Sequence, residues 1–171
     1  MAAWVAWRLA REHGGTFLLR HEDIDLTRVR EEYYGGIEQD LRWLGLDWDE
    51  TVLRQTSRIP AYEAALETLK TLGVIYPCFC TRKEINEIGA PQGPEGPLYP
   101  GTCRELSAGA RAEKLAAGMS HAWRLDSGKA ACLCGRLLTF NDLLHGVAVV
   151  DPDLLGDVVL ARKDIGVAYH L

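Results

Sequence analysis

Residues 16–25 read Thr16-Phe17-Leu18-Leu19-Arg20-His21-Glu22-Asp23-Ile24-Asp25, a short apolar segment followed at once by acidic residues. The first five residues are β-prone and predict a strand over 16–20. In an open α/β sheet, a fixed carboxylate at a strand's end suits an ammonium group or a ribose hydroxyl. By the residues alone, a solvated acidic loop paired with arginines is the favoured interpretation of the same stretch.

Helical patterns flank this segment on both sides. An apolar stripe predicts a helix from Ala2 to about residue 13, with a stop at the glycine pair 14–15. Thr27 can cap a second helix that Gly45 ends, and Ser57 with Pro60 can open a third. Residues 74–76 then predict a further strand. Helix, strand and helix with short links are typical of an α/β layer.

The second half of the chain has a weaker pattern. We expect a short helix opened by the capping box of Thr81 and Glu84, a helix near 108–117 and a strand around 121–125. Residues 157–162 and 167–171 predict a hairpin-like pair. Between residues 78 and 103 the chain is rich in proline and poor in core residues, so this segment needs a stabilising cross-link in place of a hydrophobic core.

Composition limits the class of protein. The chain has 171 residues, 47% of them apolar, and a net charge of −5, which is typical of a globular domain and withholds support for a broad nucleic-acid-binding surface. No window approaches the roughly 18 apolar residues of a membrane span. Five cysteines favour reduced thiols or metal ligands in the cytoplasm over a disulfide framework.

The cysteines give the sharpest chemical signal. Cys78 and Cys80 are followed by Tyr99-Pro100-Gly101-Thr102-Cys103, and three thiolates in one loop can converge on zinc. Tyr99 is a candidate fourth ligand, in competition with water and with the side chains of Glu105, His121, Cys132 and Cys134. The alternative is a set of inert core cysteines. No glycine-rich nucleotide loop is present, so the residues alone reveal no phosphate site.

Several stretches together resemble the glutamyl-tRNA synthetase superfamily. They are residues 17–25, the segment Leu41-Arg42-Trp43-Leu44-Gly45-Leu46-Asp47-Trp48-Asp49, the cysteine motif with Tyr99, and the segments 157–162 and 168–171. The resemblance implies an α/β fold, a partial Rossmann-type class I synthetase catalytic core with a zinc-bearing insertion. Residues 1–76 would form a Rossmann-type half without its first strand and HIGH-type motif, 77–125 the insertion, and 126–171 a connection back to the core that stops before the KMSKS-type region.

The resemblance also implies roles for residues. Glu22 matches the carboxylate that meets the glutamate ammonium group, and Tyr169 matches a tyrosine of the amino-acid pocket. The zinc ligands would be Cys78, Cys80, Tyr99 and Cys103, holding one structural Zn²⁺ per chain. The family uses ATP and Mg²⁺ to form glutamyl-adenylate. We expect a monomer without membrane contact.

One position favours a shortened branch of this family, which lacks the anticodon-binding domain and transfers glutamate to the queuosine base of tRNA(Asp). Where zinc-bearing glutamyl-tRNA synthetases can have a histidine two residues after the third cysteine, this chain has Glu105. Both ends look cut, and the HIGH-type and KMSKS-type motifs are absent, so we expect the chain to be inactive alone. The alternatives are part of an enzyme charging tRNA(Glu), or a non-catalytic zinc-stabilised module that binds tRNA or a partner.

Overall fold

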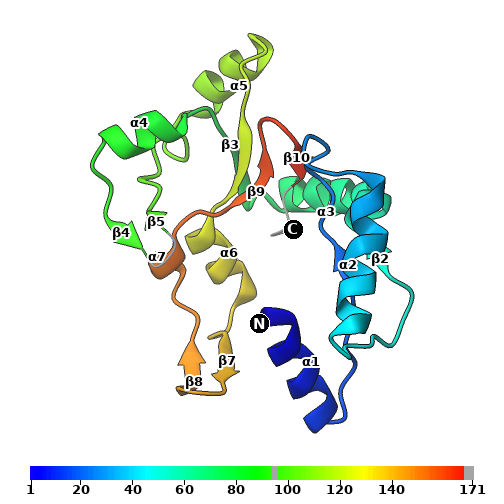
Figure 1. Cartoon of the computed structure of the whole chain (residues 1–171). Coiled ribbons are helices and arrows are strands. Elements are labelled where there is room, and N and C mark those ends of the chain that lie inside the picture. The colour runs from blue at the N-terminus through cyan, green and yellow to red at the C-terminus, as the bar shows by residue number, and fades with distance from the viewer. Residues whose placement is uncertain (94–95, 168–171) are drawn as a thin grey trace. The chain divides into compact units, whose positions relative to one another are not determined.

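A computed structural model of the chain describes residues 1–93 and 96–167 (Figure 1). The chain divides into two compact units, residues 1–61 and residues 62–171. Among the described residues, no helix combines the length and the apolar character needed to cross a lipid bilayer. The division into segments 1–76, 77–125 and 126–171 stays a prediction.

The first unit is built from three helical elements and one small parallel sheet. Helix α1 spans Ala2–Glu12, α2 spans Glu31–Trp43, the 3₁₀ helix η1 spans Gln55–Arg58, and α3 (Ile59–Leu72) begins here. Strands β1 (Arg20–His21) and β2 (Leu53–Arg54) pair in parallel, with Arg20 opposite Leu53. Gly45 follows α2 at positive φ, as the sequence predicted, and Gly73 follows α3 in the same conformation.

Two predictions in the first unit were wrong. Of residues 16–20 only Arg20 lies in a strand, because the N–H of Phe17 is donated to the carboxylate of Asp49 (2.7 Å) instead of to a neighbouring strand. Thr27 does not cap the second helix, which begins after Arg30. The Thr27 hydroxyl instead donates to the Asp25 carboxylate (2.6 Å) and so belongs to a local turn.

The second unit is organised around an antiparallel sheet of four strands in the order β10-β9-β6-β3. Its members are β3 (Ile75–Cys78), β6 (Ala122–Leu125), β9 (Val159–Arg162) and β10 (Gly166–Val167). The strand predicted at 74–76 is therefore present. Its sheet partner in the described part of the chain is the antiparallel β6, with Ile75 opposite Leu125. Of the strand predicted at 167–171, only Val167 lies within the described residues.

Two excursions leave this sheet (Figure 1). The first runs between β3 and β6 and contains α4 (Arg82–Glu87), β4 (Gln92–Gly93), β5 (Gly96–Pro97) and α5 (Ala108–Ala116). The second runs between β6 and β9 and contains α6 (Ser127–Cys134), the hairpin of β7 (Thr139–Asp142) and β8 (Gly146–Val149), and α7 (Pro152–Leu155). The capping box of α4 is formed as predicted, with Thr81 and Glu84 satisfying each other's backbone N–H groups.

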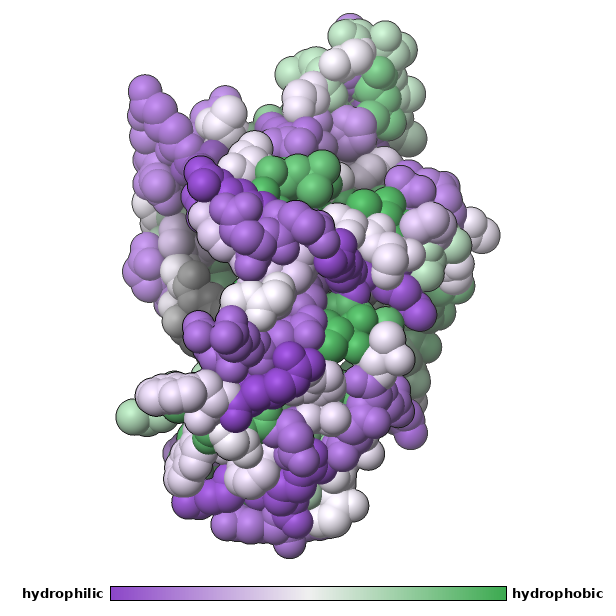
Figure 2. All heavy atoms as spheres, turned by 45° about the vertical axis from the view of Figure 1, so that its right-hand side comes forward, coloured by the Kyte–Doolittle hydropathy of each residue, from purple (hydrophilic) through white to green (hydrophobic). Residues whose placement is uncertain are grey.

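The buried residues of the second unit form two small clusters. One joins α3, β3 and β9 and consists of Leu66, Val74, Ile75, Leu160 and Ala161. The other lies at the start of the first excursion and consists of Tyr76, Cys78, Ile85, Tyr99 and Cys103. On the face drawn in Figure 2, hydrophilic residues surround separate hydrophobic patches.

Candidate functional site

The three cysteines of the first excursion converge in space. Cys78 is the last residue of β3, Cys80 lies just before the capping box of α4, and Cys103 returns after the proline-rich loop. Their sulfur atoms all lie within 4.8 Å of one another, and the Sγ atoms of Cys80 and Cys103 are 3.5 Å apart. Cys78 and Cys103 are buried and Cys80 is half-buried. The loop thus gathers three soft donors at one point.

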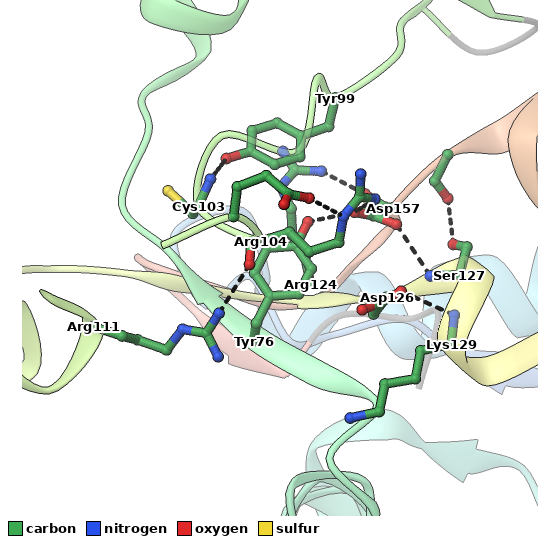
Figure 3. Close-up of polar contacts among 12 residues, drawn as sticks. Tyr76, Tyr99, Cys103, Arg104, Arg111, Arg124, Asp126, Ser127, Lys129 and Asp157 are labelled. Carbon is green, nitrogen blue, oxygen red and sulfur yellow. Dashed lines mark hydrogen bonds and ion pairs between the residues drawn. The ribbon is translucent and has the colours of Figure 1, made fainter. Parts of the chain in front are cut away.

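Tyr99 directs its hydroxyl group into this cluster (Figure 3). The oxygen accepts a hydrogen bond from the N–H of Cys103 (2.8 Å) and lies 3.4 Å from the Sγ of Cys80. The turn between them depends on Gly101, which has a φ of +85°. A side chain at that position would also meet the guanidinium of Arg104 at 2.7 Å. Tyr99 and Cys103 are therefore brought together by a tight turn.

Burial and hydrogen bonding shift the pKa values of the residues in this cluster in different directions. Burial raises the pKa of the Cys80 thiol to about 11. Burial would also raise the pKa of Cys103, but hydrogen bonds with the Tyr99 hydroxyl and from the N–H of Phe79 outweigh it, and the pKa of Cys103 is lowered. Burial, followed by the hydrogen bonds with the cysteines, raises the pKa of Tyr99. Of Cys80 and Cys103, Cys103 is therefore the thiol that ionises more readily.

The arrangement fits zinc. Four bonds of about 2.3 Å to a tetrahedral Zn²⁺ give ligand separations of about 3.8 Å, slightly less when one ligand is oxygen. The separations of 3.5 Å between Cys80 and Cys103 and 3.4 Å between Cys80 and Tyr99 are close to this value. A structural site of this kind closes the loop and stabilises the fold when metal is bound.

The other candidate ligands lie elsewhere. Glu105 is exposed and pairs with Arg104 (3.2 Å). His121 packs its ring against Phe79 and Trp123, and its Nδ1 lies 3.1 Å from a backbone carbonyl. Cys132 and Cys134 are exposed on α6. Among the described residues, no histidine or carboxylate joins the three cysteines as a metal-ligating group.

The second candidate region follows β1. Glu22 is exposed and its carboxylate pairs with Arg20 (2.7 Å), so it is accessible to a ligand. Asp23 is only 2% exposed. It accepts hydrogen bonds from the N–H of Thr56 (2.8 Å), the hydroxyl of Thr56 (2.7 Å) and the hydroxyl of Tyr34 (2.8 Å). The buried carboxylate fixes the backbone beside the exposed one.

These hydrogen bonds set the protonation states of Asp23 and Tyr34. Burial alone would raise the pKa of Asp23, but the bonds from Thr56 and Tyr34 outweigh it, so the pKa of Asp23 is lowered. The bond to Asp23 raises the pKa of Tyr34, so its hydroxyl keeps its proton and donates. Asp23 is therefore a carboxylate that anchors β1 to η1. Tyr169, the other residue assigned to glutamate by resemblance, lies outside the described residues.

The sequence did not point to the polar residues behind the cysteine cluster. The guanidinium of Arg124 lies over the ring of Tyr99, 4.2 Å from its centroid, and Arg104 pairs with the buried Asp157 (2.8 Å; Figure 3). The sequence signal that could have found Asp157 is an acidic residue directly before an apolar strand. Such a residue is buried only when it is paired, so its position before β9 indicates a partner.

Comparison with known proteins gives one consistent family. The family described as "tRNA synthetases class I (E and Q), catalytic domain" matches residues 1–171. The glutamyl-Q tRNA(Asp) synthetases of Rhodobacter capsulatus and Deinococcus radiodurans are 41% and 43% identical over 99% of the chain, which covers 63% and 53% of their own lengths. Glutamate–tRNA ligase 1 of Maricaulis maris is 36% identical over 95% of the chain and 35% of that protein.

A solved structure agrees with this comparison at the level of the fold. The glutamate–tRNA ligase of Elizabethkingia meningosepticum matches with a TM-score of 0.68 and 23% identity, over 98% of this chain and 36% of that one. The chain therefore spans between about half and two thirds of the two glutamyl-Q relatives, and about a third of the two ligases.

Proposed function

Since the chain belongs to the class I tRNA synthetase family of glutamyl and glutaminyl enzymes, we propose that it supplies the glutamate-binding part of a glutamyl-Q tRNA(Asp) synthetase. In the proposed reaction, glutamate and ATP give glutamyl-adenylate and pyrophosphate, and the glutamyl group then passes from the adenylate to queuosine in tRNA(Asp), with release of AMP. Mg²⁺ would accompany ATP. The carrying observation is the identity of 41% and 43% to glutamyl-Q synthetases over 99% of the chain.

A second observation favours tRNA(Asp) over tRNA(Glu). The identity is 36–39% to three glutamate–tRNA ligases and 39–44% to five glutamyl-Q tRNA(Asp) synthetases. In addition, Glu105 stands where a histidine can complete the metal site of zinc-bearing glutamyl-tRNA synthetases, and its side chain points to Arg104 instead. The Tyr99 hydroxyl occupies the neighbourhood of the thiols in its place.

Each site residue has a proposed task. Glu22 holds the ammonium group of glutamate as an exposed counter-charge, and the anchored Asp23 keeps that part of the backbone in position. Tyr169 lines the amino-acid pocket. Cys78, Cys80, Cys103 and Tyr99 would hold one Zn²⁺, which contributes folding free energy rather than reacting with substrate. The protein would act as a monomer in the cytoplasm.

The full reaction can be tested by transplantation. Replacing the matched segment of the Rhodobacter capsulatus relative with residues 1–171 gives a chimera with all parts of a synthetase. We expect it to transfer radiolabelled glutamate to tRNA(Asp) that carries queuosine, and not to tRNA(Asp) without queuosine or to tRNA(Glu). Transfer to tRNA(Glu) would favour the glutamyl-tRNA synthetase alternative. A folded chimera that forms no adenylate would contradict the proposal.

The 171-residue chain itself is expected to be silent in glutamate-dependent ATP–pyrophosphate exchange, because its sequence holds neither a HIGH-type nor a KMSKS-type motif. Such motifs stabilise the transferring phosphate through helix N-termini and lysine contacts. Exchange above background by the purified chain would contradict this expectation. Salt-sensitive tRNA binding by the silent chain, combined with an inactive chimera, would instead favour a non-catalytic binding module.

A further inference from the structure

Asp157 is a buried carboxylate with an unusual number of partners. Its side chain is 2% exposed, and it lies between α7 and β9. Oδ2 accepts hydrogen bonds from the hydroxyl of Tyr76 (2.5 Å) and from Nη1 of Arg104 (2.8 Å), and Oδ1 accepts one from the N–H of Ser127 (3.0 Å). A buried carboxylate is costly unless it is paired in this way. Asp157 therefore joins β3, the proline-rich loop and α6 at one point (Figure 3).

Two routes lead from Asp157 to the cysteine cluster. The first passes through Arg104, the residue directly after Cys103. The backbone carbonyl of Arg104 accepts a hydrogen bond from Arg111 (3.1 Å). The second passes through Arg124, which donates to the backbone carbonyl of Asp157 (2.7 Å) and lies over the Tyr99 ring. Each route thus ends at one of the two cluster residues that the proline-rich loop contributes.

This loop has few other means of keeping its shape. The cluster-bearing turn from residue 99 to 103 contains a proline, a glycine and a threonine between Tyr99 and Cys103, and none of the three adds to the hydrophobic cluster. Cys78, in contrast, is fixed by the pairing of β3 with β6. Tyr99 and Cys103 are themselves buried and hydrogen-bonded within the cluster, and the further polar contacts of this turn run through Arg104 and Arg124 to Asp157.

We propose that Asp157 is a positioning residue for the metal centre: its carboxylate holds Cys103 through Arg104 at ligand separation before a metal ion arrives, while its backbone carbonyl holds Arg124 over the ring of Tyr99. The inference rests on the metal centre proposed above. Asp157 does not touch the metal. It lowers the cost of metal capture because the loop is already ordered. Partners outside the ligand shell of metal sites commonly change metal affinity by about 10–100-fold when they are removed.

The test compares Asp157→Asn with Asp164→Asn in the full chain. Asp164 also pairs with an arginine (Arg162, 2.6 Å) in the same unit, but its side chain is exposed, so it controls for loss of one carboxylate charge. Zinc affinity is measured by competition with a chromophoric chelator. We expect the Zn²⁺ dissociation constant to rise about tenfold or more in Asp157→Asn and to stay within about twofold of the original in Asp164→Asn.

A second measurement separates positioning from general stability. Co²⁺ replaces Zn²⁺ and reports its ligands through thiolate charge-transfer and visible absorption bands. We expect the Co²⁺ spectrum of Asp157→Asn to change in band position or intensity at metal saturation, while circular dichroism shows a folded chain. A merely destabilised protein saturated with Co²⁺ would give the original spectrum.

Two further variants decide the matter if Asp157→Asn fails to fold. Arg104→Lys and Arg124→Lys keep the charge but lose the planar guanidinium group, and each interrupts one route. Weaker zinc binding by both would support the proposal. The proposal would be overturned if folded Asp157→Asn, or both lysine variants, bound Zn²⁺ as tightly as the original chain and gave its Co²⁺ spectrum. The proposed metal centre would not be affected by that result. If the original chain binds no zinc, the proposed metal centre fails and the inference fails with it.

Discussion

Among the residues that the structure describes, two carboxylates are buried, Asp23 and Asp157, and they occupy comparable places but have different partners. Asp23 follows a strand of the first unit and accepts hydrogen bonds from the neutral groups of Thr56 and Tyr34. Asp157 precedes a strand of the second unit and pairs with the charged Arg104 as well as with Tyr76 and Ser127. Both hold a segment beside a candidate functional residue.

The difference lies in how the neighbouring site is made. The residue beside Asp23 is Glu22, which is exposed and already close to it in sequence. The residues that Asp157 serves lie more than 50 positions away, and they must be kept together in a loop with little apolar content. A neutral network suffices to fix a short strand, whereas the loop of the second unit needs a charged anchor and, by the proposal above, a metal ion. Substitutions at the two carboxylates' neighbourhoods should therefore differ in their effect on the free energy of unfolding, most at the metal loop and least at Glu22.

Cys103→Ser has the largest expected effect, because it removes the thiol with the lowered pKa and opens the metal loop. We expect about one zinc per chain in the original protein and much less in the variant, with a strongly lowered melting temperature. Elemental analysis after purification without chelators, together with thermal unfolding, measures both. Cys134→Ser, an exposed cysteine outside the cluster, is the control and should keep its zinc. Equal zinc contents in the two variants would count against a metal centre.

Asp23→Ala comes next. It leaves the N–H of Thr56 and the hydroxyl groups of Thr56 and Tyr34 without their acceptor in a buried place. We expect a loss of about 3 kcal/mol, and about 1 kcal/mol for Asp23→Asn, which keeps one acceptor oxygen. Urea unfolding measures the free energies. Zinc content should not change in either variant, and a loss of metal would show that the two regions are not independent.

Acid should remove the stabilisation by Asp23 selectively. Because the pKa of Asp23 is lowered in the folded chain, its contribution is full above the unfolded pKa of about 4 and is lost as the pH falls through the lower folded pKa. The stability difference between the original chain and Asp23→Asn should therefore shrink below about pH 4. Asp47 and Asp49 also have lowered pKa values, but they are present in both proteins and cancel. A pH-independent difference would contradict this assignment.

Glu22→Gln should have the smallest effect on folding, because the side chain is exposed and its ion pair with Arg20 is on the surface. Unfolding curves of the 171-residue chain should coincide with those of the original. In the chimera, however, the KM for glutamate should rise about tenfold or more, since an ammonium group loses its counter-charge. A raised KM without a change in stability would separate binding from anchoring at this strand.

Local sequence predicted the local structure well. The capping box of Thr81 and Glu84 and the glycine that ends α2 follow from contacts within a few residues, and both are present. The approach of Cys78, Cys80 and Cys103 was also predicted from their place in one loop. In contrast, the strand expected at 16–20 was shortened by a side chain 32 residues away, Asp49, which no local pattern reveals.

The sequence by itself determined the family, most of the helices with their stops, and the candidate side chains for the proposed glutamate and metal sites. The tertiary structure decided which polar residues surround them. Tyr76 and Asp157 are 81 positions apart, and Arg104 and Asp157 are 53 apart, so only the antiparallel order of β3, β6 and β9 brings them together. The physical reason is that caps and turns are satisfied within one segment, whereas a buried charge is satisfied only by donors that the whole fold delivers.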